Sequence, residues 1–376
     1  MKIKTLNSLS ITDLTQMLEE YVYSLNSNEN IFHFLPAQSG LTKAGKNLQL
    51  GFTCYALKII YILDKWDNLQ LDKKNPWIDY INNFQITKSE FPSNSFIDKQ
   101  YIYFYRNQGI DVNSKEIIKK ILNKSKKYNF ELRNDSLHYF VRAETKQALA
   151  TLKQVGENSK FVYHDYPKTD QQINNYLDKL DWSKPWSAGA QFAGLCVFSS
   201  INDESSYKEK EFLINFIDKK VNNEDGGYYS GEKPSLTELV NGTMKIITGL
   251  DWLDYSIHYP KKIIDLCLSN KPSQAGCDLV DYVYVLFRCS KQTNYRKKEI
   301  VLYLLDLIGL ISNHFFPDSG GFSYDIKKSQ KLYYGVKITN QKNVADLHGT
   351  LLLTWALSMI FNLSEKSDNT WNILKP

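Results

Sequence analysis

The sequence predicts an all-α, single-domain protein in which inner and outer helices alternate along the chain. Three observations lead to this prediction: a globular composition without a linker, helical segments that recur every ~45 to 60 residues, and two copies of a glycine corner. Of the 376 residues, 43% are hydrophobic and 23% are charged, as in ordinary folded proteins. No Pro/Gly/Ser-rich segment divides the chain, so we assign residues 1–376 to one domain, with 1–45 as a possible N-terminal cap and 364–376 as a tail.

Two kinds of helical segment alternate. Residues 351–360 are apolar apart from Thr354 and Ser358, as expected for a helix that neighbours bury on every side. Residues 300–311 instead place Ile300, Leu304 and Ile308 on one stripe, which is typical of an outer helix. The inner candidates are 47–63, 138–155, 186–200, 237–253, 277–289 and 344–361. The outer candidates are 12–25, 114–127, 170–180, 207–220, 260–269 and 297–313, with 76–85 joining them less regularly. Because one helix pair cannot bury its apolar face, this repeat predicts a closed or superhelical array of helix pairs.

Two of the outer segments end in the same glycine corner. DGGY occupies 225–228 and DSGGF occupies 318–322, and 77–91 holds a fainter copy. Glycine allows the positive φ that a sharp reversal needs, so we expect these segments to turn the chain. A polar triplet then opens each following apolar helix, Asn-Gly-Thr at 241–243 and His-Gly-Thr at 348–350.

On these motifs the sequence resembles the α/α toroid superfamily of terpenoid cyclases and protein prenyltransferases, whose repeats carry a Gly-Gly-aromatic turn between outer and inner helices. The resemblance implies a closed barrel of roughly six inner/outer helix pairs and a cyclase-like lyase or isomerase. The Asp-x-Asp-Asp acid motif of class II terpenoid cyclases is absent. Asp281 and His348 match two zinc ligands of the prenyltransferases, but Val283 stands where that family has a thiolate. We therefore predict neither a metal nor another cofactor.

We expect the first-turn polar side chains of the inner helices to surround one mouth of a central cavity, where helix N-termini add partial positive charge. His348 is the candidate for proton transfer, because imidazole exchanges protons near neutral pH; a histidine that bonds to another helix's backbone is the alternative. Asp278 and Asp281 share a helical face and are its candidate acidic counterparts. The candidate substrate-binding residues are Arg142, Asn241, Trp186, Tyr228, Tyr324, Glu238 and Asp346.

Several of these candidates also have structural interpretations. Asp346 and Glu238 suit the starts of helices, where a carboxylate accepts hydrogen bonds from free N–H groups. Arg142 lies in an apolar stripe, and a buried guanidinium needs an anion, which would be a carboxylate of another helix or a substrate. Tyr228 and Tyr324 follow the glycine corners, where packing on the preceding helix competes with a place at the cavity rim.

Three functions are compatible with the sequence. The leading hypothesis is a terpenoid-cyclase- or prenyltransferase-like enzyme with acid/base chemistry in a central cavity. The second is a carbohydrate-active α/α toroid enzyme, a lyase, hydrolase or epimerase of uronic-acid polysaccharides. A tyrosine-lined open cleft would favour sugars, and a closed aromatic cavity would favour isoprenoids. The third is a non-catalytic binding or scaffold module, in which Arg142, Asn241 and His348 would be saturated by internal hydrogen bonds.

The charge distribution, the apolar runs and the cysteines restrict the possible partners and the location of the protein. The net charge of +5 is spread through mixed-sign segments, and small basic clusters such as 124–127 are more typical of solvated helix ends than of a nucleic-acid patch. We find no signal-like start and no apolar run near ~20 residues, so we expect a cytoplasmic protein without an integral membrane segment. The five scattered cysteines predict reduced core thiols. The expected partner is a small-molecule or oligosaccharide substrate, and the oligomeric state is open.

Overall fold

The fold is mostly helical. The structure is a computed structural model that describes residues 6, 9–27, 30–125, 130, 132–202, 206–365 and 370–376. These residues form fifteen helices and three small antiparallel hairpins. The hairpins pair β1 (Gln85–Ile86) with β2 (Ser95–Phe96), β3 (Phe315–Phe316) with β4 (Gly321–Phe322), and β5 (Leu332–Tyr333) with β6 (Val336–Lys337). No helix of the described ranges has both the length and the hydropathy to cross a bilayer.

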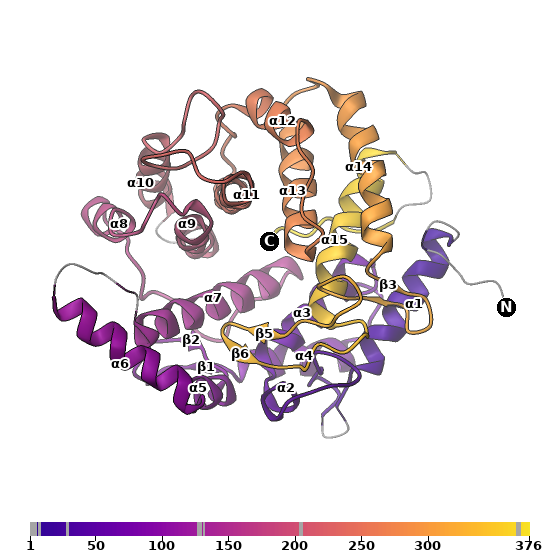
Figure 1. Cartoon of the computed structure of the whole chain (residues 1–376). Helices are drawn as coiled ribbons and strands as arrows, with labels where there is room; N and C mark the ends of the chain where they lie inside the picture. Colours follow the sequence, from indigo (N-terminus) through magenta and orange to yellow (C-terminus); the bar gives the residue numbers. More distant parts are fainter. Residues whose placement is uncertain are drawn as a thin grey trace.

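Six helices, called the ring helices below, contact one another in a closed circuit. Contacts run from α3 to α7, α9, α11, α13 and α15 in turn, and α15 packs back on α3. Figure 1 shows these helices around a common centre, with the C-terminal residues between them. Their bounds agree with the predicted inner segments: α3 (Leu50–Ile62), α7 (Arg133–Gln154), α9 (Pro185–Ile201), α11 (Leu236–Trp252), α13 (Gly276–Gln292) and α15 (Leu347–Leu363).

Most ring helices are buried because they are apolar on nearly all sides, whereas α7 carries charged residues along its length and buries nine of its 22 residues. On α3 every residue except Tyr61 is buried, and on α15 only Asn362 is exposed. A helix of this composition is stable only where other elements cover it all round. Neighbouring ring helices and a second layer of helices supply that cover.

The second layer consists of amphipathic helices outside the ring. α8 and α10 pack on α9, α12 and α14 pack on α13, and α1 and α4 pack on α3. The buried stripe of α14 is Ile300, Leu304, Leu307 and Ile311, whereas the predicted Ile308 is only half-buried. The helices outside the ring are α1 (Ile11–Ser24), α2 (Lys43–Asn47), α4 (Leu71–Asn82), α5 (Lys99–Arg106), α6 (Ile110–Lys124), α8 (Asp170–Leu177), α10 (Ser206–Asp218), α12 (Pro260–Leu268) and α14 (Lys297–Ser312).

Both glycine corners turn the chain as predicted. Gly226 and Gly320 have φ of +80° and +82°, values that L side chains rarely adopt. The second glycine of each pair is required for close packing instead. A Cβ on Gly227 would lie 2.4 Å from Leu239 Cδ1, and one on Gly321 would lie 2.6 Å from the ring of Tyr21. The second corner therefore holds the N-terminal helix α1 against the rest of the chain.

The faint third copy forms a corner without glycine. β1 and β2 follow α4, and Asn94 adopts the positive φ of +64° there, which asparagine tolerates better than most residues. The amide of Phe96 then donates to Thr145 Oγ1 on α7 at 3.0 Å. The amide of Phe322 donates to Thr350 Oγ1 on α15 over the same distance. The sequence repeat therefore includes the hydrogen bond by which the β1–β2 and β3–β4 hairpins each bind a threonine of a ring helix.

Gly349→Ala is predicted to destabilise the fold. A Cβ at this position would lie 2.3 Å from both the carbonyl carbon of Ser323 and the amide nitrogen of Tyr324, so backbone must move, at a cost of ~3 kcal/mol. Gly309→Ala is the matched control, because Gly309 is exposed on α14 and a Cβ there would meet no atom within 4 Å, and alanine should stabilise that helix by up to ~1 kcal/mol. Urea unfolding measures both. Equal stability of the two variants would contradict the close packing at the 348–350 triplet.

Candidate functional site

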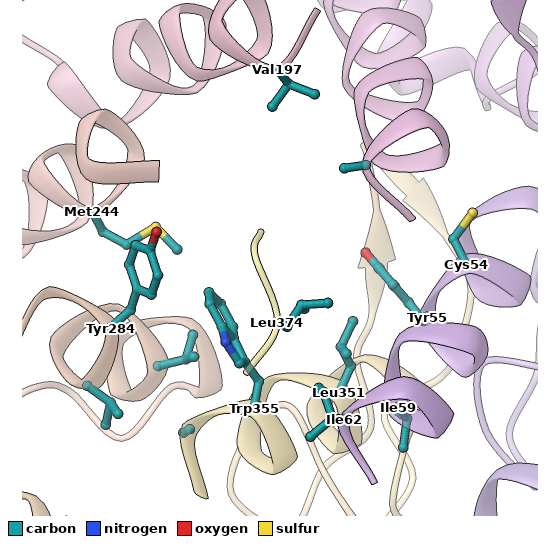
Figure 2. Packing of buried hydrophobic residues seen from close by; sticks show 14 of the residues in the cluster. Cys54, Tyr55, Ile59, Ile62, Val197, Met244, Tyr284, Leu351, Trp355 and Leu374 are labelled. Carbon is teal, nitrogen blue, oxygen red and sulfur yellow. The ribbon is translucent and has the colours of Figure 1, made fainter. Parts of the chain in front are cut away.

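A cavity of ≈ 410 Å³ lies inside the circuit of ring helices, and every ring helix contributes to its wall. Residues of the β5–β6 hairpin and of the C-terminal segment complete it. Figure 2 shows Tyr55, Met244, Trp355 and Leu374 around this central space. The lining residues are Tyr55, Lys58, Arg142, Ala143, Lys146, Gln147, Trp186, Ala190, Gln191, Ala193, Gly194, Met244, Lys245, Cys277, Val280, Asp281, Gln330, Tyr333, Tyr334, His348, Leu351, Leu352, Trp355, Leu374 and Pro376.

Positive charge dominates the cavity wall. Lys58, Arg142, Lys146 and Lys245 line it, whereas Asp281 is the single acidic side chain among the described lining residues. Within the described part of the chain, none of the three lysines forms an ion pair or a hydrogen bond. Unpaired charge inside a protein is costly, so this wall is suited to an anionic ligand.

The lysines lie well inside their helices, away from the helix ends. Lys58 is the only charged residue of α3, and it is 7% exposed. Lys146 follows Arg142 by one helical turn on α7, so both side chains project from one face. Lys245 extends from α11 next to Met244, which also lines the cavity.

Burial shifts two of these ammonium groups toward the neutral form. It lowers the pKa of Lys58 to about 8. At Lys146, burial and then the positive charges of Lys245 and Lys58 lower the pKa to about 7. At neutral pH a substantial fraction of Lys146 is therefore an uncharged amine.

Asp281 is the acidic group that faces these cations. Burial raises its pKa to about 7, although the nearby Lys245 ammonium opposes the shift. Its Oδ2 atom has no hydrogen-bond partner among the described residues. A carboxyl group with a pKa near neutrality and a free oxygen can donate or accept a proton at cellular pH.

His348 lies between two tyrosine rings. Its ring stacks on Tyr55 at a centroid distance of 4.8 Å and on Tyr324 at 5.2 Å, with interplanar angles of 6° and 18°. Burial, followed by the charges of Lys245 and Lys58, lowers its pKa to about 3, and Nδ1 has no partner among the described residues. The imidazole is thus neutral at cellular pH, and it lines the cavity. Its role in proton transfer stays a prediction.

Arg142 is held by tyrosines instead of a protein carboxylate. Its guanidinium lies 4.9 Å from the centre of the Tyr176 ring, and although burial opposes the shift, the nearby Tyr176 and Tyr163 raise the pKa of Arg142. The Nε atom has no partner in the described structure. Of the two anions expected for this residue, a carboxylate on another helix is therefore absent from the described residues.

Asn241 and Asp278 are bonded to each other and do not line the cavity. Asn241 Nδ2 donates to Asp278 Oδ1 at 2.8 Å, and the Ser273 hydroxyl donates to the other carboxylate oxygen. Asn241 is fully buried. The pair links α11 to α13, and only the Asn241 Oδ1 atom has no described partner. The structure thus separates Asp278 from Asp281, which does line the cavity.

The other predicted residues divide between the cavity and structural positions. Trp186 lines the cavity, and its amide donates to the Glu238 carboxylate at 2.8 Å. Asp346 is fully buried and accepts hydrogen bonds from three backbone amides, including that of Gly349. Tyr228 does not rim the cavity, because it is buried away from it and hydrogen-bonds to His258.

Tyr324 contacts two residues of the cavity wall, His348 and Cys277. Besides stacking on His348, it donates a hydrogen bond to Cys277 Sγ at 3.0 Å. Burial raises the pKa of the Cys277 thiol to about 11, so this group stays protonated. All five cysteines are free, as predicted.

The β5–β6 hairpin covers the cavity beside α3 and α7. Its residues Tyr333 and Tyr334 line the wall, and the Tyr333 hydroxyl donates to Glu144 Oε1 on α7 at 2.8 Å. Burial raises the pKa of Glu144 to about 8. Gly51 allows the hairpin to approach α3, because a Cβ there would lie 2.0 Å from the Tyr333 hydroxyl.

The C-terminal segment closes the ring at the last residues of three ring helices. The Asn372 amide donates to the Ile62 carbonyl, where α3 ends. The Lys375 amide donates to Gln154 Oε1, where α7 ends. The Trp252 indole, at the end of α11, donates to the carbonyl of Pro376 at 2.7 Å. The predicted tail is thus part of the cavity wall, with Leu374 pointing into the central space (Figure 2).

The cavity lysines were not among the predicted site residues. A signal for them exists in the sequence, since Lys58 is the only charge in the otherwise apolar segment 50–62 and Lys245 is the only charge between 239 and 250. A lone lysine in a segment that must be buried on all sides has to face an internal cavity or an anion. Tyr333, Tyr334 and the C-terminal residues lie in loops, where no periodicity indicates a position.

No protein-family profile matches the chain, and no curated protein matches it. Within the described ranges, no group of three His, Cys, Asp or Glu side chains is arranged to hold a metal ion.

Lys146→Met is predicted to stabilise the unliganded protein, most strongly at low pH. An unfolded lysine titrates near pH ~10.4, so below pH 7 both states are protonated and the folded state bears the full cost of the buried charge. Between pH 7 and about 10 the folded amine is already neutral, and the cost declines as the pH rises. We expect a gain of roughly 2 kcal/mol at pH 6 that disappears by about pH 10.

Urea unfolding of the variant and the wild type at both pH values measures this gain. Lys208→Met on α10, an exposed position, is the control and should change stability little at either pH. A Lys146→Met protein that is less stable at pH 6 would show that the ammonium has a stabilising partner.

Proposed function

We propose that the protein is a single-domain α/α toroid enzyme that binds a small anionic substrate in its central cavity and performs acid/base chemistry there. The closed circuit of six ring helices and the second layer outside it support the toroid assignment. The observation that carries the functional proposal is the cavity wall, where four cationic side chains face one carboxyl group.

The charge balance of the wall favours an anion over a neutral ligand. Burying the Lys58 ammonium and half-burying those of Lys146 and Lys245 without hydrogen-bond partners is unfavourable, and a bound anion offsets this cost. In a cavity from which water is partly excluded, attraction between opposite charges is several times stronger than in bulk water. The first turns of α9, α13 and α15 place Trp186, Cys277 and His348 on the cavity wall, and the N-termini of these helices add partial positive charge.

The aromatic and apolar parts of the wall favour a terpenoid-cyclase- or prenyltransferase-like substrate. Tyr55, Tyr333 and Trp355 alternate with aliphatic side chains such as Leu351 around the cavity. The hairpin and the C-terminal segment enclose it at two places. An isoprenoid bearing an anionic group would place its chain against this surface and its charge against the lysines.

The proposed chemistry depends on Asp281 and the neutral His348. Asp281 is the group that would donate or accept the proton, because its pKa lies near neutrality and one oxygen is free. His348 and Arg142 would orient the substrate with their unpartnered nitrogen atoms. These free groups argue against the non-catalytic scaffold, whose polar groups would be saturated.

A uronic-acid carbohydrate is the second candidate substrate. The same cations would neutralise its carboxylate, and the tyrosines at the hairpin would stack on sugar rings. The two substrate classes differ in the part of the molecule that accompanies the anionic group. An isoprenoid carries an apolar chain, and a uronic-acid carbohydrate carries a row of hydroxyl groups.

Calorimetric titration with inorganic diphosphate, a prenyl diphosphate and a galacturonate oligomer tests the proposal. We expect an anion to bind with a 1:1 stoichiometry, and we expect Lys245→Gln to weaken its binding at least ~10-fold, which corresponds to ~1.4 kcal/mol. Lys208→Gln on the exposed face of α10 should leave the affinity unchanged. Stronger binding of the prenyl diphosphate than of diphosphate supports the isoprenoid class, and preference for galacturonate supports the carbohydrate class. Equal losses in both lysine variants, or no binding of any anion, would contradict the proposed site.

A further inference from the structure

We propose that Lys146 is a covalent nucleophile that forms a Schiff base with the aldehyde or ketone group of an anionic substrate. This inference rests on the proposed anion-binding cavity, but it adds a reaction that anion binding does not require. It assigns different roles to the lysines: Lys58 and Lys245 hold the anionic group, and Lys146 attacks the carbonyl carbon.

Lys146 lines the central cavity, so its side chain can meet a ligand bound there. On α9 the wall includes the small residues Ala190, Ala193 and Gly194 besides Trp186 and Gln191. A Cβ added to Gly194 would meet only the Phe198 ring, at 4.0 Å, an ordinary van der Waals contact. Lys146 has no ion-pair or hydrogen-bond partner among the described residues, so its amine is free to react.

The electrostatic surroundings favour the reactive form of the amine. Nucleophilic attack needs the unprotonated amine, and burial near other cations is a known way to obtain it. Lys58 and Lys245 are those cations, and with burial they lower the pKa of Lys146 to about 7. A bound anion would partly neutralise Lys58 and Lys245 while leaving the geometry around Lys146 intact.

The proposed step is balanced in atoms and electrons. The nitrogen lone pair attacks the carbonyl carbon, the C=O π electrons move to oxygen, and the nitrogen loses one proton while the oxygen takes one, which gives a neutral carbinolamine. The hydroxyl group takes a second proton and leaves as water as the nitrogen lone pair forms the C=N bond, and the iminium then loses the remaining N–H proton to give the Schiff base. Asp281 is the carboxyl group on the cavity wall that can give and recover these protons.

Pyridoxal 5′-phosphate, an aldehyde that carries a phosphate, is a suitable probe. The protein is incubated with stoichiometric probe at pH 7, reduced with borohydride and digested, and the modified lysines are identified by mass spectrometry. We expect Lys146 to be modified ~100-fold faster than the exposed Lys208. Inorganic diphosphate should suppress the modification, and pyridoxal without phosphate should react far more slowly.

Two variants separate covalent reaction from folding and from binding. Lys146→Arg keeps the positive charge but has no reactive amine, so it should lose the adduct and still bind diphosphate in the calorimeter. Gly194→Leu should hinder the adduct by filling part of the cavity that Lys146 also lines, and Gly309→Leu on the exposed face of α14 is its matched control. Circular dichroism confirms that each variant folds.

The outcomes distinguish this inference from the proposed function. If diphosphate binds but the adduct forms on Lys58, on Lys245 or on surface lysines at the same rate, the nucleophilic role of Lys146 is overturned while the anion site stands. If neither diphosphate nor the aldehyde binds in the cavity, both proposals fail. An adduct on Lys146 that diphosphate suppresses and Lys146→Arg abolishes supports the Schiff base.

Discussion

The circuit of ring helices is the constraint on which the rest of the structure depends. Ring helices such as α3 and α15 are apolar on almost all sides, so each needs a neighbouring helix on both sides and another layer outside it. The contact between α15 and α3 supplies the last neighbour and brings the two ends of the described helical series together. Helices arranged in such a circuit do not fill their common centre, and the polar residues that face it meet each other instead of bulk water.

The groups that line this central space, which we propose bind the substrate, reduce the stability of the unliganded protein. Three lysines without described partners and a carboxyl group with a raised pKa are unfavourable in the unliganded protein. Such costs persist in proteins where a ligand offsets them, and functional sites are where local rules of stability are broken. The hairpin and the C-terminal segment strengthen the effect, because they restrict the water that would otherwise screen the charges.

The sequence predicted the helices better than the site, for a physical reason. Apolar periodicity determines which segments are buried, so α11 and α15 were predicted almost to their ends, and the glycine corners were predicted from the conformations that only glycine adopts easily. The direction of a side chain on a ring helix depends on the angle at which the ring closes. Asn241 therefore pairs with Asp278 although it was predicted to face the cavity, and Lys245, one turn later on α11, lines it. The contacts of the β5–β6 hairpin and of the C-terminal segment join residues that are far apart in the sequence, so the local hydrophobic pattern does not predict them.

A crystal structure of the protein grown with tungstate would test the central claim most directly. Tungstate is a divalent anion whose anomalous scattering locates it without reference to the protein density. The account predicts one strong anomalous peak inside the circuit of ring helices, within hydrogen-bonding distance of at least two of Lys58, Lys146 and Lys245. Ring helices that do not close on one another, or a closed ring whose only tungstate lies on the outer surface, would contradict it.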